Sequence, residues 1–337
     1  MKQAVLYQTG SSNSFKIQKM EPPELKKDHI LVKVDHAGVA FADVMMRHGK
    51  YPGAPKLPFA PGYDICGIVQ KVGDSVTGIS VGDKVIALTR FGGYSQLAVV
   101  HYKRAVKVSQ NINSAEAAAL VLNYISAYQM LSKYKNLKTG NKILIHSAAG
   151  GVGTAAAQIG SFWGLKVYGT CSTKKKSIVE QCGGIPIDYT KNDFVPVLRD
   201  LEPDGFDIIL DPIGGRHWLR SKSLLNRTGI LIGYGFFSMF NKDKVVSGLT
   251  ESVKLILSLI FKSGLPGGKK FKLYSINPNN HKEIQDSLKN ILEMYLNRKI
   301  KPVIYKIYNL EDVSKAHFDL ANSISYGKII LNCNNCQ

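Results

Sequence analysis

Residues 142–158 have the sequence KILIHSAAGGVGTAAAQ, and this stretch decides the fold class. An apolar run typical of a buried strand ends at Ile145, small residues follow, and an alanine-rich helical segment begins. Glycines let the backbone turn sharply and let a ligand lie against it, and the following helix directs free N–H groups at an anion. Strand, turn and helix together predict a dinucleotide site, with an ordinary tight turn as the alternative. The predicted contacts are Ala149, Gly150, Gly151, Val152 and Gly153.

The segment after the next apolar run bears on which dinucleotide is bound. Residues 166–171 are KVYGTC, a second parallel strand, and residues 172–176 are STKKK. A site for NAD usually has Asp or Glu here to bind the ribose 2′-hydroxyl, but no acid lies between Lys166 and Glu180. Hydroxyls and lysines suit a 2′-phosphate, so the sequence favours NADP(H), with Ser172 and Lys176 as contacts. A solvated first helical turn is the alternative for the lysines.

Length and composition bound the class of protein. The chain has 337 residues, 45% of them hydrophobic, and a formal net charge of +19. These values predict a globular protein of two domains. The lysines are spread along the chain without a recognition motif, so we expect no nucleic-acid partner. The N-terminus enters a strand without a secretory signal, and the five cysteines form no disulfide framework, which together indicate a cytoplasmic protein.

Two patterns divide the chain. Short strand signals broken by glycine and proline dominate the first part and return near the C-terminus, which predicts a β-rich domain over residues 1–122 and 278–337. Residues 123–277 contain apolar runs separated by helical segments, which predicts a doubly wound parallel sheet that binds the dinucleotide. The apolar runs are centred on Ile143, Val167, Ile185, Ile208 and Ile230.

Several motifs, in order, resemble the medium-chain dehydrogenase/reductase superfamily across nearly the whole chain. They include AGVAFAD at 37–43, PGYDICGIV at 61–69, VGDKV at 81–85, the glycine turn, and DPIGG at 211–215. The set is most similar to the zinc-free quinone oxidoreductase branch, especially its vesicle amine transport protein-like group. The resemblance implies an α/β fold, with a Rossmann doubly wound parallel sheet and a β-rich GroES-like catalytic domain. It also implies reduction of quinones or other α,β-unsaturated carbonyls by NADPH.

Two positions depart from the metal-dependent relatives. Those relatives carry Cys near Ala40 and a His-Glu pair where this chain has Tyr63 and Asp64. Neither Ala40 nor Tyr63 ligates zinc, so we expect no metal. Zinc-free reductases usually have Asn at the Ala40 position, and its loss leaves open an NADPH-binding sensor or membrane-associated partner with little turnover. The basic-flanked apolar segment at 253–262 suits that alternative, although a helix covering the sheet is the preferred interpretation.

Resemblance and position select the remaining candidate residues. Tyr51 and Tyr63 are candidate proton donors, because a phenol donates a hydrogen bond without ionising, and the alternative is that both rings only line a pocket. Asn123 and Ser126 are assigned to cofactor or substrate positioning. The other predicted cofactor contacts follow strands of the parallel sheet, and they are Tyr189 near the adenosine and Tyr234, Gly235 and Phe236 along the cofactor. A helix-entry cap is the alternative for Asn123 and Ser126.

Three further features complete the expectations. Asp43 falls on a structural aspartate position of the family, and His146 has no partner motif, so we expect both to be hydrogen-bonded core residues. Residues 271–276 lie where relatives pair sheet edges, and an exposed edge strand favours such pairing, which predicts a homodimer. The expected partner otherwise is a small-molecule quinone or enone substrate.

Overall fold

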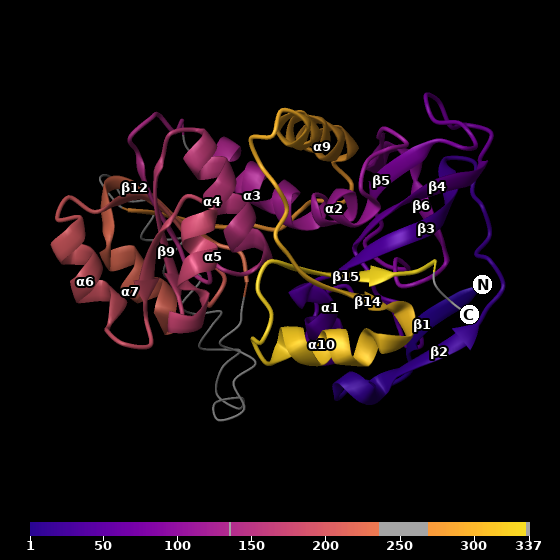
Figure 1. Cartoon of the computed structure of the whole chain (residues 1–337), viewed down its shortest axis with the longest axis horizontal. Helices are drawn as coiled ribbons and strands as arrows, with labels where there is room; N and C mark the ends of the chain where they lie inside the picture. Colours follow the sequence, from indigo (N-terminus) through magenta and orange to yellow (C-terminus); the bar gives the residue numbers. More distant parts are fainter. Residues whose placement is uncertain (135, 236–268, 335–337) are drawn as a thin grey trace. The chain divides into compact units, whose positions relative to one another are not determined.

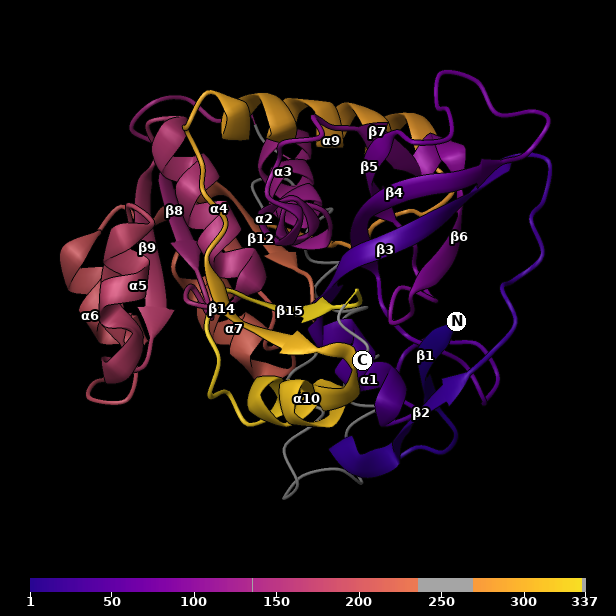
Figure 2. The ribbon, with the colours of Figure 1, turned by 45° about the vertical axis from the view of Figure 1, so that its right-hand side comes forward.

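The computed structural model describes residues 1–134, 136–235 and 269–334. Contacts divide the chain into two units. Met1–Ile125 and Asn277–Gln337 form the first, which we call the β-rich unit, and Ser126–Ile276 form the second, which we call the parallel-sheet unit. The C-terminal part of the chain thus returns to the N-terminal part. Figures 1 and 2 show the C-terminal elements in yellow beside N-terminal elements in indigo.

A single six-stranded sheet organises the parallel-sheet unit, and all of its neighbouring strands are parallel. Its strands are β8 (Lys142–Ile145), β9 (Lys166–Cys171), β10 (Ile185–Asp188), β11 (Phe206–Asp211), β12 (Leu225–Gly233) and β13 (Lys270–Leu273). The order across the sheet is β10-β9-β8-β11-β12-β13. Numbered along the unit, this is the 3-2-1-4-5-6 order of a Rossmann sheet, which confirms the predicted fold class.

The helices of this unit follow its strands in turn. They are α4 (Gly151–Phe162), α5 (Lys176–Gln181), α6 (Phe194–Leu201) and α7 (Arg216–Ser223), with a short 3-10 helix η3 (Thr173–Lys175) before α5. Helix α4 packs on β8 and β9, and α7 packs on β11 and β12. The central strand β8 is fully buried at Ile143, Leu144 and Ile145. Burial on both faces explains why its sequence is a continuous apolar run rather than an alternating one.

A seven-stranded sheet and a hairpin form the core of the β-rich unit. The hairpin pairs β1 (Lys2–Leu6) with β2 (Phe15–Lys19). The sheet has the order β14-β15-β3-β4-β5-β7, and β6 pairs with β3. Its strands are β3 (His29–Val39), β4 (Asp64–Val72), β5 (Lys84–Leu88), β6 (Leu97–His101), β7 (Ala105–Lys107), β14 (Ile304–Asn309) and β15 (Lys328–Asn332). The long strand β3 lies against β15, β4 and β6, so it joins the two ends of the chain.

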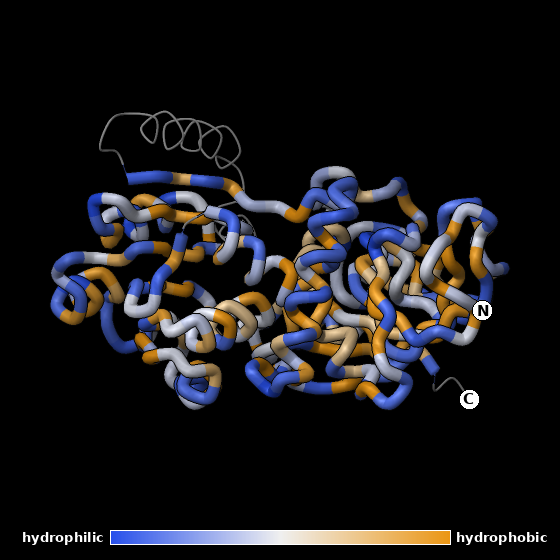
Figure 3. Tube along the Cα trace, turned by 90° about the horizontal axis from the view of Figure 1, so that it is seen from above, coloured by the Kyte–Doolittle hydropathy of each residue, from blue (hydrophilic) through white to orange (hydrophobic). Residues whose placement is uncertain are grey.

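The helices assigned to the β-rich unit are α1 (Phe41–Arg47), α2 (Ser114–Ala119), α9 (His281–Leu296) and α10 (Val313–Ala321). Helix α3 (Leu122–Lys133) begins in this unit and continues into the next. Apolar side chains of β3, β4, β15 and α10 share one buried cluster. Figure 3 shows hydrophobic stretches, in orange, alternating with hydrophilic turns along the chain. This alternation is the pattern from which the short strands were predicted.

Three expectations concern the far end of the parallel-sheet unit. Strand β13 covers part of the predicted 271–276 segment and is the last described strand of the sheet, beside β12. Pairing of two chains through β13 stays a prediction. Phe236 and the 253–262 segment lie outside the described residues. Within the described ranges, no helix has both the length and the apolar character needed to cross a membrane.

Candidate active site

The glycine turn between β8 and α4 has the geometry of an anion-binding turn. Ser147, rather than a glycine, takes the left-handed backbone conformation, with φ of 55°. The N–H of Gly150 donates to the Ser147 carbonyl at 2.9 Å, and Gly150 then forms the N-cap of α4 with φ of −80°. The first amides of a helix have no partner within it, so this turn presents donors to an anion.

Gly153 allows α4 to lie close against this turn. A Cβ on Gly153 would lie 2.4 Å from the Ser147 carbonyl oxygen and 2.6 Å from the Ala148 Cα. A Cβ on Gly150 would lie 3.2 Å from the same oxygen. The requirement for glycine is therefore a close backbone approach at position 153 and not a positive φ within the triplet.

Backbone hydrogen bonds bring the neighbouring loops to the same edge of the sheet. Ala148 donates to the Thr170 carbonyl at 3.0 Å, and Tyr189 donates to the Cys171 carbonyl at 3.2 Å. On the other side, Tyr234 donates to the Asp211 carbonyl at 3.2 Å. In parallel sheets, this carboxyl edge is where dinucleotides bind.

Tyr189, Tyr234 and Gly235 differ in their surroundings. The Tyr189 side chain, which follows β10, is 55% exposed. Tyr234 and Gly235 follow β12. A Cβ on Gly235 would lie 2.7 Å from the Pro212 carbonyl oxygen, so this glycine permits close packing on the 211–215 turn.

The loop after β9 carries hydroxyls and lysines next to one acid that sequence reasoning missed. Ser172 is the N-cap of η3, and Lys176 is the exposed first residue of α5. Lys175 is half-buried, and burial lowers the pKa of its ammonium. Asp188, from the end of β10, accepts a 2.6 Å hydrogen bond from the Thr173 hydroxyl. The sequence argument covered only the segment between Lys166 and Glu180, whereas Asp188 ends the next strand.

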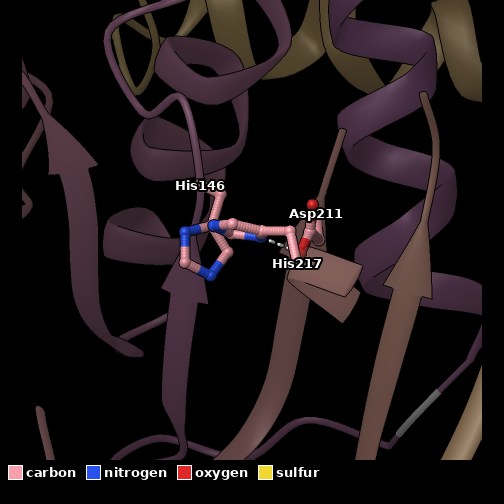
Figure 4. A group of neighbouring side chains, drawn as sticks. All are labelled: His146, Asp211 and His217. Carbon is pink, nitrogen blue, oxygen red and sulfur yellow. Dashed lines mark hydrogen bonds and ion pairs between the residues drawn. The ribbon is translucent and has the colours of Figure 1, made fainter. Parts of the chain in front are cut away.

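A buried network of polar side chains joins the ends of β8, β9 and β11 with α7. The Thr170 hydroxyl lies 3.0 Å from His146 Nδ1, and His146 Nε2 lies 3.1 Å from the Ser221 Oγ. Ser221 Oγ also lies 2.7 Å from Asp211 Oδ2, which accepts a 2.6 Å hydrogen bond from His217 Nδ1. Figure 4 shows His217 and Asp211 joined in this way beside His146.

Burial determines the protonation of this network. It lowers the pKa of His146 to about 3, so the imidazole is neutral at physiological pH. Burial alone would raise the pKa of Asp211, but the hydrogen bond from His217 and the nearby histidines lower it below its ordinary value. His146 is a hydrogen-bonded core residue, as predicted. Its partners were not predicted, because they come from three separate segments.

Tyr51 and Tyr63 form a pair in the β-rich unit. Their hydroxyl groups share a hydrogen bond, and their rings meet edge to face with centroids 6.1 Å apart. Tyr63 is 8% exposed, and burial together with Tyr51 raises the pKa of its phenol. Tyr51 is half-buried. Tyr63 is therefore protonated, and Tyr51 is the member of the pair closer to solvent.

Arg90 and Phe91 lie beside this pair. The Tyr63 ring lies 6.3 Å from the Phe91 ring, and the guanidinium of Arg90 lies over Phe91 at 5.0 Å. Arg90 has a left-handed backbone with φ of 73°, which is uncommon for a residue with a long side chain. The Tyr63 carbonyl accepts the amides of Thr89 and Arg90 at 2.8 and 3.4 Å. These contacts fix the backbone of Tyr63.

Asp43 is a buried core residue, as predicted. Its carboxylate accepts hydrogen bonds from the Ala40 amide at 2.9 Å, the Gly62 amide at 3.2 Å and the Tyr94 hydroxyl at 2.9 Å. Burial raises its pKa to about 6 in spite of these donors. Asp43 thereby ties the start of α1 to the residue that precedes Tyr63.

Sequence comparisons agree with this geometry. Residues 26–110 match the alcohol dehydrogenase GroES-like domain family, and residues 185–331 match the zinc-binding dehydrogenase family. The zebrafish (Danio rerio) synaptic vesicle membrane protein VAT-1 homolog is 34% identical over 334 residues, which span 97% of this chain and 69% of that protein. The chain belongs to the medium-chain dehydrogenase/reductase superfamily. This confirms the resemblance found from the motifs.

Other members of the superfamily extend the comparison. Human quinone oxidoreductase is 28% identical over 337 residues, covering 98% of this chain and 97% of that one. The structure of Escherichia coli quinone oxidoreductase in complex with NADPH superposes with a TM-score of 0.86, covering 98% of this chain and 100% of that chain. At 24% identity this second likeness shows a shared fold.

The positions that hold zinc in metal-dependent members of the superfamily do not fit a metal here. Ala40 has no donor atom, and the Tyr63 hydroxyl is bonded to Tyr51. Asp64 Oδ2 forms a 2.8 Å ion pair with Lys328 and accepts the Leu122 amide at 3.2 Å. The side chains at this place thus have other partners, and we derive no step through a metal there.

The same contact of Asp64 explains the start of α3. Asn123 and Ser126 lie inside this helix, and each is 7% exposed. Leu122 is the first residue of the helix, and its N–H donates a hydrogen bond to Asp64 Oδ2 from β4. Asn123 and Ser126 are therefore not the entry cap. Their assignment to cofactor or substrate positioning stays a prediction.

Proposed function

We propose that this protein is a zinc-independent, NADPH-dependent reductase of quinones or other α,β-unsaturated carbonyls. The observation that carries the proposal is the hydrogen-bonded pair Tyr51–Tyr63, at a position where metal-dependent members of the superfamily hold a zinc ligand. Such members polarise the substrate oxygen with the metal. Here a pair of protonated phenols offers an alternative donor.

The carboxyl edge of the parallel sheet supports the cofactor part of the proposal. Because Gly153 has no side chain, α4 can lie close against the turn, as a pyrophosphate-binding turn requires. The first backbone amides of α4 are then available to bind phosphate. Lys175 and Lys176 follow β9, where the ribose lies in Rossmann folds, so we assign the 2′-phosphate to Ser172 and these lysines. Human quinone oxidoreductase, a full-length relative, has the activity that its name states.

NADPH, when bound, supplies the hydride. As the acceptor carbon receives it, negative charge develops on the carbonyl oxygen, and a preorganised O–H donor stabilises that charge. We assign the donor to Tyr51, the more exposed phenol. The buried Tyr63 donates its own proton to Tyr51 Oη, which leaves the Tyr51 proton free to point at substrate. Tyr51 is then the catalytic residue and Tyr63 a positioning residue.

The test measures NADPH oxidation at the nicotinamide absorbance band with a panel of quinones and enones, and repeats it with NADH. We expect NADPH-dependent turnover with one of the two substrate classes. Tyr51→Phe should lower kcat by about a hundredfold, the usual size of a lost proton donor, with the Kd for NADPH unchanged. Tyr63→Phe should lower kcat less, because Tyr51 keeps its own hydroxyl.

A matched control for these variants is Tyr102→Phe, which removes a phenol stacked on His101 elsewhere in the β-rich unit. It should leave kcat unchanged. Normal turnover by Tyr51→Phe would overturn the assignment of the donor. Binding of NADPH without turnover across the whole panel would overturn the reductase.

A second candidate function is an NADPH-binding partner protein at a membrane surface. The printed names of the VAT-1 relatives, which describe synaptic vesicle membrane proteins, favour it. Flotation of the protein with anionic liposomes tests this candidate, with Leu257→Asp and Phe261→Asp as disrupting variants. Flotation that both variants abolish, together with absent turnover, supports the partner protein. Absence of flotation by the wild type excludes it.

A further inference from the structure

We propose that His146, Asp211 and His217 form a binding site for a divalent transition metal such as Zn²⁺. The ligand atoms of the three side chains all lie within 4.8 Å of one another, at the ends of β8 and β11 and the start of α7 (Figure 4). Two imidazoles and one carboxylate are ligands that zinc prefers. This place lies in the parallel-sheet unit, whereas the superfamily's zinc-ligand positions, Ala40 and Tyr63, belong to the β-rich unit.

Four polar atoms come close together at this place. Asp211 Oδ2 lies 2.6 Å from His217 Nδ1, and Ser221 Oγ lies 2.7 Å from Asp211 Oδ2, 3.1 Å from His146 Nε2 and 3.4 Å from His217 Nδ1. In a tetrahedral zinc site with ordinary bond lengths, ligand atoms are about 3.3 Å apart. Ser221 Oγ contacts all three side chains and is therefore the candidate fourth ligand, while the 2.6 and 2.7 Å contacts must lengthen to admit a metal.

The hydrogen bonds of the network allow the histidine tautomers that metal binding requires. Ser221 has one proton, which it gives to Asp211 Oδ2, so His146 must donate from Nε2 to Ser221 and accept from Thr170 at Nδ1. Metal binding at Nε2 requires the other tautomer, with the His146 proton on Nδ1. The Thr170 hydroxyl can accept that proton as readily as it donates. His217 likewise needs its proton on Nε2 to bind a metal through Nδ1.

The surrounding groups are those that orient metal ligands. Asp211 Oδ1 accepts the Ile213 amide at 2.7 Å, and Thr170 holds the far side of the His146 ring. Such outer contacts fix ligand orientation and contribute to affinity. The His146 and His217 rings meet edge to face at 4.5 Å, with Phe194 covering the former at 4.9 Å. A metal here would link the end of β8 to α7 independently of any cofactor.

The experiment titrates the full-length, chelator-treated protein with Co²⁺ and follows the visible absorption that tetrahedral cobalt produces, then displaces it with Zn²⁺. We expect one Co²⁺ per chain and a higher Tm in the presence of either metal. His217→Asn and His217→Gln should each abolish saturable binding. Thr170→Val should weaken it by about tenfold, the effect of losing an outer contact.

His281→Asn is the matched control, because His281 packs on His101 in another cluster of histidines and separates adventitious binding from the proposed site. It should bind Co²⁺ as the wild type does. Circular dichroism and the Tm without metal show whether each variant is folded. Retained binding in a folded His217 variant, or no saturable binding by the wild type, would overturn the proposal and leave a hydrogen-bond network only.

Discussion

The carboxyl edge of the parallel sheet and the surroundings of the Tyr51–Tyr63 pair in the β-rich unit are built in opposite ways. The first is made of turns that directly follow strands, and its main donors are backbone amides at the start of α4. The second depends on buried charged side chains from distant segments, such as Asp64 and Lys328, which are 264 residues apart in sequence. Backbone amides tolerate many sequences around them, whereas a buried charge tolerates no loss of its partner.

The contrast shows which kind of substitution disrupts each region. The glycine turn is disrupted when a side chain is added, because Gly153 lies against the backbone of Ser147 and Ala148 without room for a Cβ. The surroundings of the tyrosine pair are disrupted when a side chain is removed, because Asp43 and Asp64 are fully buried carboxylates held by specific donors. Four substitutions or titrations measure this difference.

The largest effect is expected at the ion pair between Lys328 and Asp64, which are 3% and 0% exposed. Lys328→Met leaves a buried carboxylate without its cation, and such a loss costs about 3–5 kcal/mol of unfolding free energy. Urea unfolding at neutral pH measures it. The double variant Lys328→Met with Asp64→Asn should recover part of the loss, since the amide oxygen still accepts the Leu122 amide. A cost below about 1 kcal/mol would show that the pair is not needed.

The next effect is the pH dependence that Asp43 imparts. Its pKa is raised from 3.8 to about 6, so between these values the folded state binds more protons than the unfolded state. Stability from this group is therefore full below pH 3.8 and falls as pH rises through 6, by about 3 kcal/mol. The unfolding free energy of the wild type minus that of Asp43→Asn, measured across this pH range, isolates the contribution of Asp43. This difference should fall as pH rises, and a difference that rises with pH would contradict the raised pKa.

The fold was largely predictable because its signals are local. Apolar runs centred on Ile143, Val167 and Ile208 are strands β8, β9 and β11. The glycine turn follows from three neighbouring glycines and two flanking elements. The sequence also predicts that the C-terminal part belongs to the β-rich domain, because strand signals return near the C-terminus.

The side-chain partnerships were not predictable from spacing. His146 meets Ser221 and Asp211 only after three strands and a helix have packed, and nothing in its neighbourhood in sequence indicates this. The position of Asp188 beside the loop was not predicted, because an acid was expected after β9 and Asp188 ends β10. The hydrophobic periodicity of a helix or strand indicates which of its faces is buried. The hydrogen-bond partners of a buried polar side chain depend instead on how neighbouring helices and strands are aligned.

Gly153→Ala tests the glycine turn, and Gly150→Ala is its control. The new methyl at 153 would lie 2.4 Å from the Ser147 carbonyl, so backbone must move, at a cost of about 1–3 kcal/mol and with weaker NADPH binding. At 150 the contact is 3.2 Å and φ is −80°, which any residue adopts. Thermal unfolding and NADPH titration compare the two. Equal effects would show that space at 153 is not the requirement.

The smallest effect is expected at Asp188, which is half-buried and ionised, with its pKa lowered to about 2 by the hydroxyls of Thr173 and Thr190. Its charge lies beside the loop to which we assign the 2′-phosphate. Asp188→Asn keeps an acceptor for Thr173 and removes the charge, so it should tighten NADPH binding roughly twofold to fivefold and leave NADH unchanged. Fluorescence titration of both cofactors at low and high salt measures this, and the gain should shrink at high salt. An equal increase in affinity for NADH would show that the 2′-phosphate does not lie beside Asp188, and the assignment of this loop to the 2′-phosphate would then be wrong.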